Sequence, residues 1–165
     1  MKMKIGIIGI VIIIIIGIGI YSYRKNKENP KVKEITKLQL FKYHYINGNS
    51  MYANTDYQLE CNEKCIATIK SNGIPEEQSL IVEVKEETVT ELINLLNEYK
   101  VGYWNGFQKS DKRVKDGHSF SIGIKVQDDI YISASGYMKY PKNFREVSKK
   151  IENIFQSIYD QNKKE

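Results

Sequence analysis

The stretch ITKLQLFKYHYING, residues 35–48, joins a run of strand-forming residues to a turn signal, and it decides the fold. Its first twelve residues are rich in the aromatic and branched types that strands favour. Asn47-Gly48 follows, a pair typical of two-residue hairpin turns, because both central positions of such a turn need a positive φ. The stretch therefore predicts a strand that turns back to pair with a second strand.

Three more strand-like runs follow in the first half of the chain. One runs through MYANTDYQLE at 51–60, and the next is CIATIK at 65–70, which Ser71-Asn72-Gly73 closes. SLIVEV at 79–84 is either a fourth strand or a lead into the next element. Short strands joined by turn residues predict an antiparallel meander.

The second half of the chain contains two helical patterns with a strand pair between them. Apolar residues recur at steps of three and one from Glu87 to Lys100, and at similar steps from Asn143 onward, so each set gathers on one helical face. SFSIGIKV at 119–126 and IYISAS at 130–135 alternate with period two around three turn residues. This order predicts an α+β domain, an antiparallel sheet with two helices on one face.

An uncharged apolar run from Ile5 to Ile20 precedes this domain. A cleavable signal would end in small residues, whereas Tyr21-Ser22-Tyr23 places large rings there. Extended to the second tyrosine, a helix would be about 28 Å long, close to the roughly 30 Å hydrocarbon core of a bilayer. We therefore expect three parts: a retained N-terminal transmembrane anchor at 1–24, a polar linker at 25–33 and a single α+β domain at 34–165.

The basic residues around the apolar run give two interpretations of membrane orientation. More of them follow the run than precede it, which by the positive-inside rule would place the domain in the cytoplasm. A short basic N-terminus followed directly by an apolar run has instead the form of an uncleaved signal, which delivers the C-terminal part outward. We expect the second arrangement, a single-pass protein of the cell membrane with its soluble domain extracellular.

The positive charge of the chain belongs to the membrane flanks and not to the domain. Of the 25 basic and 20 acidic residues, five basic and one acidic precede Lys31, which leaves 20 and 19 in the rest of the chain. Nucleic-acid binding needs a basic face, so we expect no nucleic acid among the partners. The basic flanks suit anionic lipid instead.

Five short motifs of the second half form a pattern that spans roughly residues 100–145: WNGF at 104–107, VKDG at 114–117, FSI at 120–122, ASG at 134–136 and YPKNF at 140–144. The pattern resembles that of small, uncharacterised membrane-anchored or lipoprotein-like domains of low-GC Gram-positive bacteria. This chain departs from it at the second hairpin turn, where Asp128-Asp129 replaces the usual Asp-Gly. The resemblance implies no activity.

Cys61 and Cys65 enclose a tight loop of three residues between two predicted strands. Strand pairing would bring their β-carbons face to face, which makes a disulfide feasible. Two inert free thiols are the alternative. A metal or redox site has the least support, because the only histidines, His44 and His118, do not complete a four-ligand site. We expect no metal and no cofactor.

The sequence contains no residue set that identifies a catalytic site. His118 precedes Ser119, but successive strand residues point to opposite faces, so the two side chains cannot easily meet. Asp116-Gly117 before them is typical of a turn. We interpret His44, inside the first predicted strand, as a half-exposed strand residue. The adjacent acid pairs elsewhere are typical of helix starts and solvated turns.

Four aromatic residues fall in connections, and they are the candidate binding residues: Trp104, Phe107, Tyr137 and Tyr140. Loops carry binding residues more often than cores do. The alternative is structural, with the first two closing the end of the sheet and the tyrosines lying over the last helix. We expect a non-catalytic module that binds a protein or cell-envelope partner. The alternatives are a cell-envelope hydrolase with unidentified acids and an immunity or inhibitor-type protein.

Overall fold

A computed structural model describes residues 30–48, 54–71 and 79–162 of the chain. Val32–Glu165 form one compact unit, and the residues up to Lys31 group separately. The predicted anchor at 1–24 lies outside the described residues. Among the helices that are described, none combines the length and the apolar composition that crossing a membrane needs.

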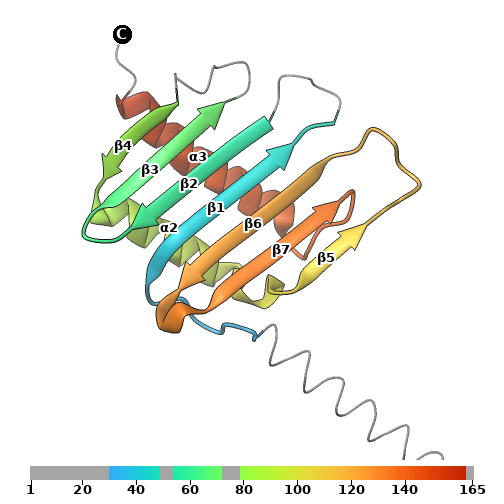
Figure 1. Ribbon diagram of the computed structural model, residues 1–165, viewed down its shortest axis with the longest axis horizontal. Coiled ribbons are helices and arrows are strands. Elements are labelled where there is room, and N and C mark those ends of the chain that lie inside the picture. Colours follow the sequence, from blue (N-terminus) through green and yellow to red (C-terminus); the bar gives the residue numbers. More distant parts are fainter. Residues whose placement is uncertain (1–29, 49–53, 72–78, 163–165) are drawn as a thin grey trace, which may run out of the picture. The chain divides into compact units, whose positions relative to one another are not determined.

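One seven-stranded sheet carries two helices on a single face (Figure 1). Across the sheet the strands follow the order β4-β3-β2-β1-β6-β7-β5. The strands are Leu38–Ile46 (β1), Asn54–Cys61 (β2), Cys65–Ser71 (β3), Leu80–Val84 (β4), Phe107–Ser110 (β5), Ser119–Val126 (β6) and Tyr131–Tyr137 (β7). The helices are Glu86–Glu98 (α2) and Phe144–Asn162 (α3), with short 3-10 turns at Val101–Trp104 (η2) and Gln127–Asp129 (η3). The predicted α+β architecture with two helices is confirmed.

The central strand β1 shows how the two faces of the sheet differ. It pairs antiparallel with β2 on one side and β6 on the other. Phe41 stacks on Phe155 of α3 with ring centroids 5.9 Å apart, and the Tyr43 hydroxyl lies 2.5 Å from that of Ser148 on the same helix. Because alternate strand residues point to opposite faces, the intervening side chains of β1 point to the face that carries no described helix. We call it the open face.

The connection between β1 and β2 is longer than the sequence predicts. Ile46 pairs with Asn54, so seven residues join the strands instead of the two of an Asn47-Gly48 hairpin. Gly48 packs against the loop before β6, where a β-carbon on it would lie 2.3 Å from the carbonyl oxygen of Gly117. Here the glycine permits a close backbone approach and does not form the tight turn.

β5 was not predicted, and it pairs in parallel with β7, whereas the other strand pairs of the described residues are antiparallel. The WNGF motif builds the junction that leads into it. Trp104 packs on Phe144 of α3, and the Asn105 side chain accepts a hydrogen bond of 2.9 Å from the backbone N–H of Ser133. Gly106 then takes a φ of 76° and donates its own N–H to the Ser133 carbonyl. The motif thus fixes the start of an edge strand.

Asp128 and Asp129 form the turn between β6 and β7 at η3. Both have a positive φ, 57° and 56°, and the Ile130 N–H donates to the Gln127 carbonyl at 3.2 Å. This is the backbone of a two-residue hairpin turn with two left-handed positions, for which Asp-Gly is the commoner choice. Lys125 forms an ion pair of 2.7 Å with Asp129 across the turn.

The segment that leads into β1 is fastened to the rest of the domain. The Asn97 amide of α2 accepts a hydrogen bond from the backbone N–H of Ile35 and donates one to its carbonyl, both 2.8 Å long. On the other side, the Gln127 amide donates to the Glu34 carbonyl at 2.8 Å. Two side-chain amides therefore do for this segment what a neighbouring strand would do.

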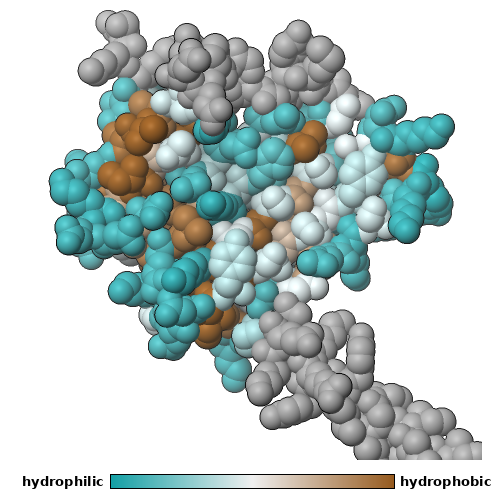
Figure 2. All heavy atoms as spheres, in the orientation of Figure 1, coloured by the Kyte–Doolittle hydropathy of each residue, from teal (hydrophilic) through white to brown (hydrophobic). Residues whose placement is uncertain are grey.

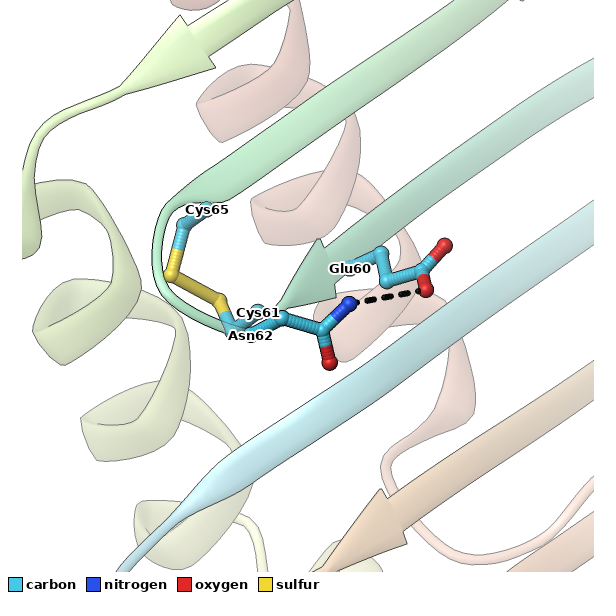
Figure 3. The surroundings of a disulfide bond; sticks show 4 residues. All are labelled: Glu60, Cys61, Asn62 and Cys65. Carbon is cyan, nitrogen blue, oxygen red and sulfur yellow. Dashed lines mark hydrogen bonds between the residues drawn. A yellow bond between two sulfur atoms is a disulfide. The ribbon is translucent and has the colours of Figure 1, made fainter.

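A disulfide joins Cys61 and Cys65 at the end of the β2–β3 hairpin (Figure 3). The two cysteines are paired in the strand register with their α-carbons 4.1 Å apart. Asn62 donates its side-chain amide to Glu60 beside the bridge. Part of the apolar core packs against both sulfurs, so the bridge lies on the helix-covered side of the sheet.

Candidate binding site on the open face of the sheet

One of the four predicted binding residues lies in the core, and two more are partly buried against it. Trp104 is only 6% exposed. The rings of Phe107 and Tyr140 both pack against Phe120 of β6, with centroid distances of 6.2 and 5.8 Å. Phe120 is itself buried and stacks toward α3. These three rings close one end of the helix-covered core, as the structural alternative describes.

Tyr137 lies on the other face and holds a loop. Its hydroxyl donates to the Lys115 carbonyl at 2.6 Å and accepts from the Gly117 N–H at 2.8 Å. The tyrosine thereby ties the connection between β5 and β6 to β7. Because its ring lies on the opposite face from the other three, the four aromatic residues do not form one surface.

The open face carries polar side chains and a shallow hollow at its centre. Figure 2 shows this face, where hydrophilic and intermediate residues cover most of the sheet. The hollow has a volume of about 440 Å³ and is lined by side chains from five strands. We call it the polar hollow, and its lining includes Lys42, His44, Asp56, Gln58, Thr68, Lys70, Ser121, Gly123, Tyr131 and Ser133.

His44 and Asp56 form the centre of the polar hollow. They are directly opposite in the β1–β2 register, and His44 Nδ1 lies 2.5 Å from Asp56 Oδ1. An ionised carboxylate only accepts hydrogen bonds, so Nδ1 carries the proton, and in the neutral ring Nε2 is left as an acceptor. The pair presents one fixed imidazole, about a third exposed, to whatever occupies the hollow.

Ser121 extends this pair into a row of three across neighbouring strands, because it stands opposite His44 in the β1–β6 register. The order serine, histidine, aspartate is that of a nucleophilic triad. Within the described residues, however, no hydrogen bond joins Ser121 to His44. A triad also needs backbone N–H groups that are free to stabilise an oxyanion. Around Ser121, β6 pairs with β1 on one side and β7 on the other, so its backbone N–H groups are used in the sheet.

Tyr131 forms one wall of the polar hollow by lying over Gly123. A β-carbon on that glycine would be 2.2 Å from the tyrosine hydroxyl oxygen and 3.0 Å from Cζ, so any larger residue would displace the end of the tyrosine side chain. An aromatic ring that covers a glycine on the neighbouring strand restores packing that the missing side chain would give. The ring remains 50% exposed and offers an apolar surface among polar groups.

A second hollow, of about 770 Å³, is a furrow between α2 and α3. Four carboxylates of α2 line it, those of Glu86, Glu87, Glu91 and Glu98, with Lys150 opposite. Glu86 and Glu87 lie in the first turn of α2, where negative charge favours the helix dipole. Because these side chains are exposed on the helix surfaces, whereas the polar hollow gathers groups from five strands, we place the candidate site in the polar hollow.

Sequence reasoning missed the polar hollow although part of its signal is visible. Phe41 and Tyr43 alternate with Lys42 and His44, so the period-two pattern already puts the lysine and the histidine on one face. The pairing of His44 with Asp56 depends on the seven-residue connection, which no local pattern indicates. The position of Tyr131 over Gly123 likewise depends on the register of β6 and β7.

No protein-family model matches the chain, and no curated protein is significantly similar to it. The function is therefore inferred from the geometry of the open face and from the sequence at its N-terminus.

Proposed function

We propose that this chain is a membrane-tethered extracytoplasmic binding module that takes its ligand in the polar hollow. The observation that carries the proposal is the open face itself. A seven-stranded sheet has both described helices on one side, and the other side gathers hydroxyl, amide, ammonium, imidazole and carboxylate groups around one hollow. Convergent polar groups beside an apolar wall are the usual composition of a binding site.

Two features support binding over catalysis. His44 is held in one tautomer by Asp56, but Ser121 makes no hydrogen bond to it in the described part of the chain. The strands that carry these residues use their backbone groups in ladders, which leaves no pair of donors for a developing oxyanion. A fixed pattern of donors and acceptors on a rigid sheet suits recognition.

The location is proposed from the N-terminal run and supported by the cysteines. The run from Ile5 to Ile20 suits a spanning helix without a cleavable end. A disulfide such as Cys61–Cys65 persists in oxidising compartments. Protease added to intact cells should remove the domain and leave the anchor, whereas protection until lysis would place the domain inside.

Photocrosslinking from the full chain in its own membrane tests the site. A photoreactive residue at Ser133, in the polar hollow, should give a specific adduct. The same residue at Lys149, on the exposed surface of α3, is the matched control and should give none. Adding Asp56→Asn, which removes the charge that orients His44, should reduce the Ser133 adduct.

Two results would contradict the proposed site. Equal yields of adduct from Ser133 and Lys149 would show that ligands do not bind the open face in preference to the surface of α3. No adduct from Ser133 would show that the open face binds nothing in the envelope. Melting curves of each variant are needed beside the adducts, because a loss of adduct counts only when the fold is kept.

A further inference from the structure

We infer that the ligand of the polar hollow is an anionic carbohydrate, a polyhydroxylated ring that carries an acidic group. This rests on the proposed function, because it names the ligand of the same site. Three properties of the lining support it, namely an exposed aromatic ring, groups that both donate and accept hydrogen bonds, and an exposed ammonium group.

The aromatic ring is that of Tyr131. It lies over Gly123 and keeps half of its surface exposed at the wall of the hollow. Sugar rings present C–H groups on their faces and hydroxyls around their edges, so they need an apolar plane with polar groups beside it. Tyrosine supplies such a plane and a polar tip. Because the sheet beneath is paired on both sides, the ring is held by a rigid support.

The hydrogen-bonding groups suit hydroxyl ligands. Gln58, Ser121 and Ser133 line the hollow, and each side chain both donates and accepts. A sugar hydroxyl does the same, so each can be satisfied in either direction. His44 adds an acceptor at Nε2 in its neutral form, because its Nδ1 proton is used by Asp56. A purely apolar or purely cationic ligand would leave these groups unpaired.

The charge of the lining selects an acidic sugar over a neutral one. The lining contains the exposed ammonium group of Lys42, and the carboxylate of Asp56 on the neighbouring strand is already bonded to the imidazole of His44. Lys42 stands next to Gly123 in the register, directly beside the space that Tyr131 covers. Complementary charge gives specificity and faster association.

Binding of three probes to the full chain in nanodiscs, by titration calorimetry, tests the inference. The probes are tetragalacturonate, the neutral maltotetraose and inorganic phosphate. We expect tetragalacturonate to bind at least about tenfold more tightly than the other two, a difference of about 1.4 kcal/mol. The affinity should fall as salt is raised, because charge contributes to it.

Variants separate the contribution of the ring from that of the charge. Tyr131→Ala should weaken tetragalacturonate binding about tenfold, and Tyr131→Phe, which keeps the plane, less than about threefold. Lys42→Gln should reduce both the affinity and its dependence on salt. Lys149→Gln on α3 removes an equal charge away from the hollow and should change neither.

The possible outcomes distinguish this inference from the proposed function. Equal binding of phosphate and tetragalacturonate would reduce the site to a general anion site and overturn the inference. So would tight maltotetraose binding, or a protein as the Ser133 photoadduct, while the binding module itself would stand. No binding of any probe together with no photoadduct would remove both.

Discussion

At the scale of single residues, two core tyrosines make the stability depend on alkaline pH. Burial, together with the nearby charge of Glu152, raises the pKa of Tyr57 to about 12 and also raises that of Tyr43. The ordinary value is 10.0. When folding raises the pKa of a group, that group stabilises the folded state fully at any pH below its pKa in the unfolded chain. This stabilisation is lost as the pH rises through the pKa that the group has in the folded state.

We therefore predict that the free energy of unfolding falls between about pH 10 and pH 12, because the unfolded chain releases these protons first. Denaturant titrations followed by circular dichroism at several pH values measure the fall. Tyr57→Phe should make it shallower. Tyr103→Phe, at a tyrosine that is 45% exposed, is the control and should leave it unchanged. Identical curves for the two variants would contradict this account.

Tyr137 gives a second prediction at this scale. Tyr137→Phe keeps the ring but removes the hydrogen bonds to Lys115 and Gly117, so it should cost about 1–3 kcal/mol of stability. Tyr131→Phe is the matched control on the same strand and face, and it should cost less. Thermal unfolding compares them. Equal melting temperatures would mean that the loop before β6 does not depend on this hydroxyl.

For the aromatic candidate binding residues, the residue type alone indicated burial better than it indicated a binding role. Trp104, Phe107 and Tyr140 were separated from the periodic rows because they fall between predicted elements. They pack in or against the core all the same, because β5 and the start of α3 bring Phe107 and Tyr140 onto Phe120, and Trp104 onto Phe144. A connection is solvent-exposed only when nothing packs on it, and sequence spacing does not report that.

At the scale of elements, the β6–β7 turn places Asp129 at a positive φ, a conformation that aspartate favours less than glycine does. A non-glycine residue in the left-handed region costs about 1–2 kcal/mol, and glycine adds only about 0.5–1 kcal/mol of unfolded-state entropy. Asp129→Gly should therefore stabilise the domain by about 0.5 kcal/mol, after the loss of an exposed ion pair with Lys125.

Chemical denaturation of Asp129→Gly beside Lys125→Ala measures this gain. The second variant breaks the same ion pair without changing the turn, so it isolates the small electrostatic loss. A destabilised Asp129→Gly with an unaffected Lys125→Ala would mean that the left-handed aspartate is not strained.

Elements with a long, regular apolar pattern were predicted well. The short strand β5, and the β1–β2 connection that depends on a contact distant in sequence, were not. β6 was predicted at 119–126 and both helices near their observed bounds, because apolar periodicity reports a buried face directly. β5 has four residues, too few for a period, and it forms because Asn105 and Gly106 place it beside β7. The β1–β2 connection was misjudged because Gly48 serves a contact with residue 117.

At the scale of the whole molecule, the disulfide should matter more as a marker of compartment than as a source of stability. It closes a loop with three residues between the cysteines, so removing it should cost only about 1–2 kcal/mol. Thermal unfolding of Cys61→Ser/Cys65→Ser measures that cost. Alkylation of protein from the cell surface before and after reduction, read by mass spectrometry, should show oxidised thiols. Thiols that are free in both samples would weaken the extracellular assignment.

The polar hollow is a property of the whole fold, which is why the sequence did not reveal it. His44 and Asp56 are twelve residues apart, Ser121 comes from the second half of the chain, and the three meet only when β2, β1 and β6 pair. Local patterns predict which face each residue joins, but register across strands fixes which residues meet.

The hydrogen bonds that hold the segment before β1 have a mechanical consequence if the domain is pulled from its N-terminus. Tension that arrives at Val32 meets the hydrogen bond from its N–H to the Gly102 carbonyl first, then the Gln127 and Asn97 amides, and then the central strand β1. The ladder bonds of β1 lie across the strand on both sides. Bonds arranged in that way are loaded together and must rupture together. In force spectroscopy these bonds should yield in a small early step, which Asn97→Ala should shift to lower force, and the sheet should yield later in a single step. A domain pulled from its N-terminus would then lengthen slightly before its sheet, and with it the open face, was lost.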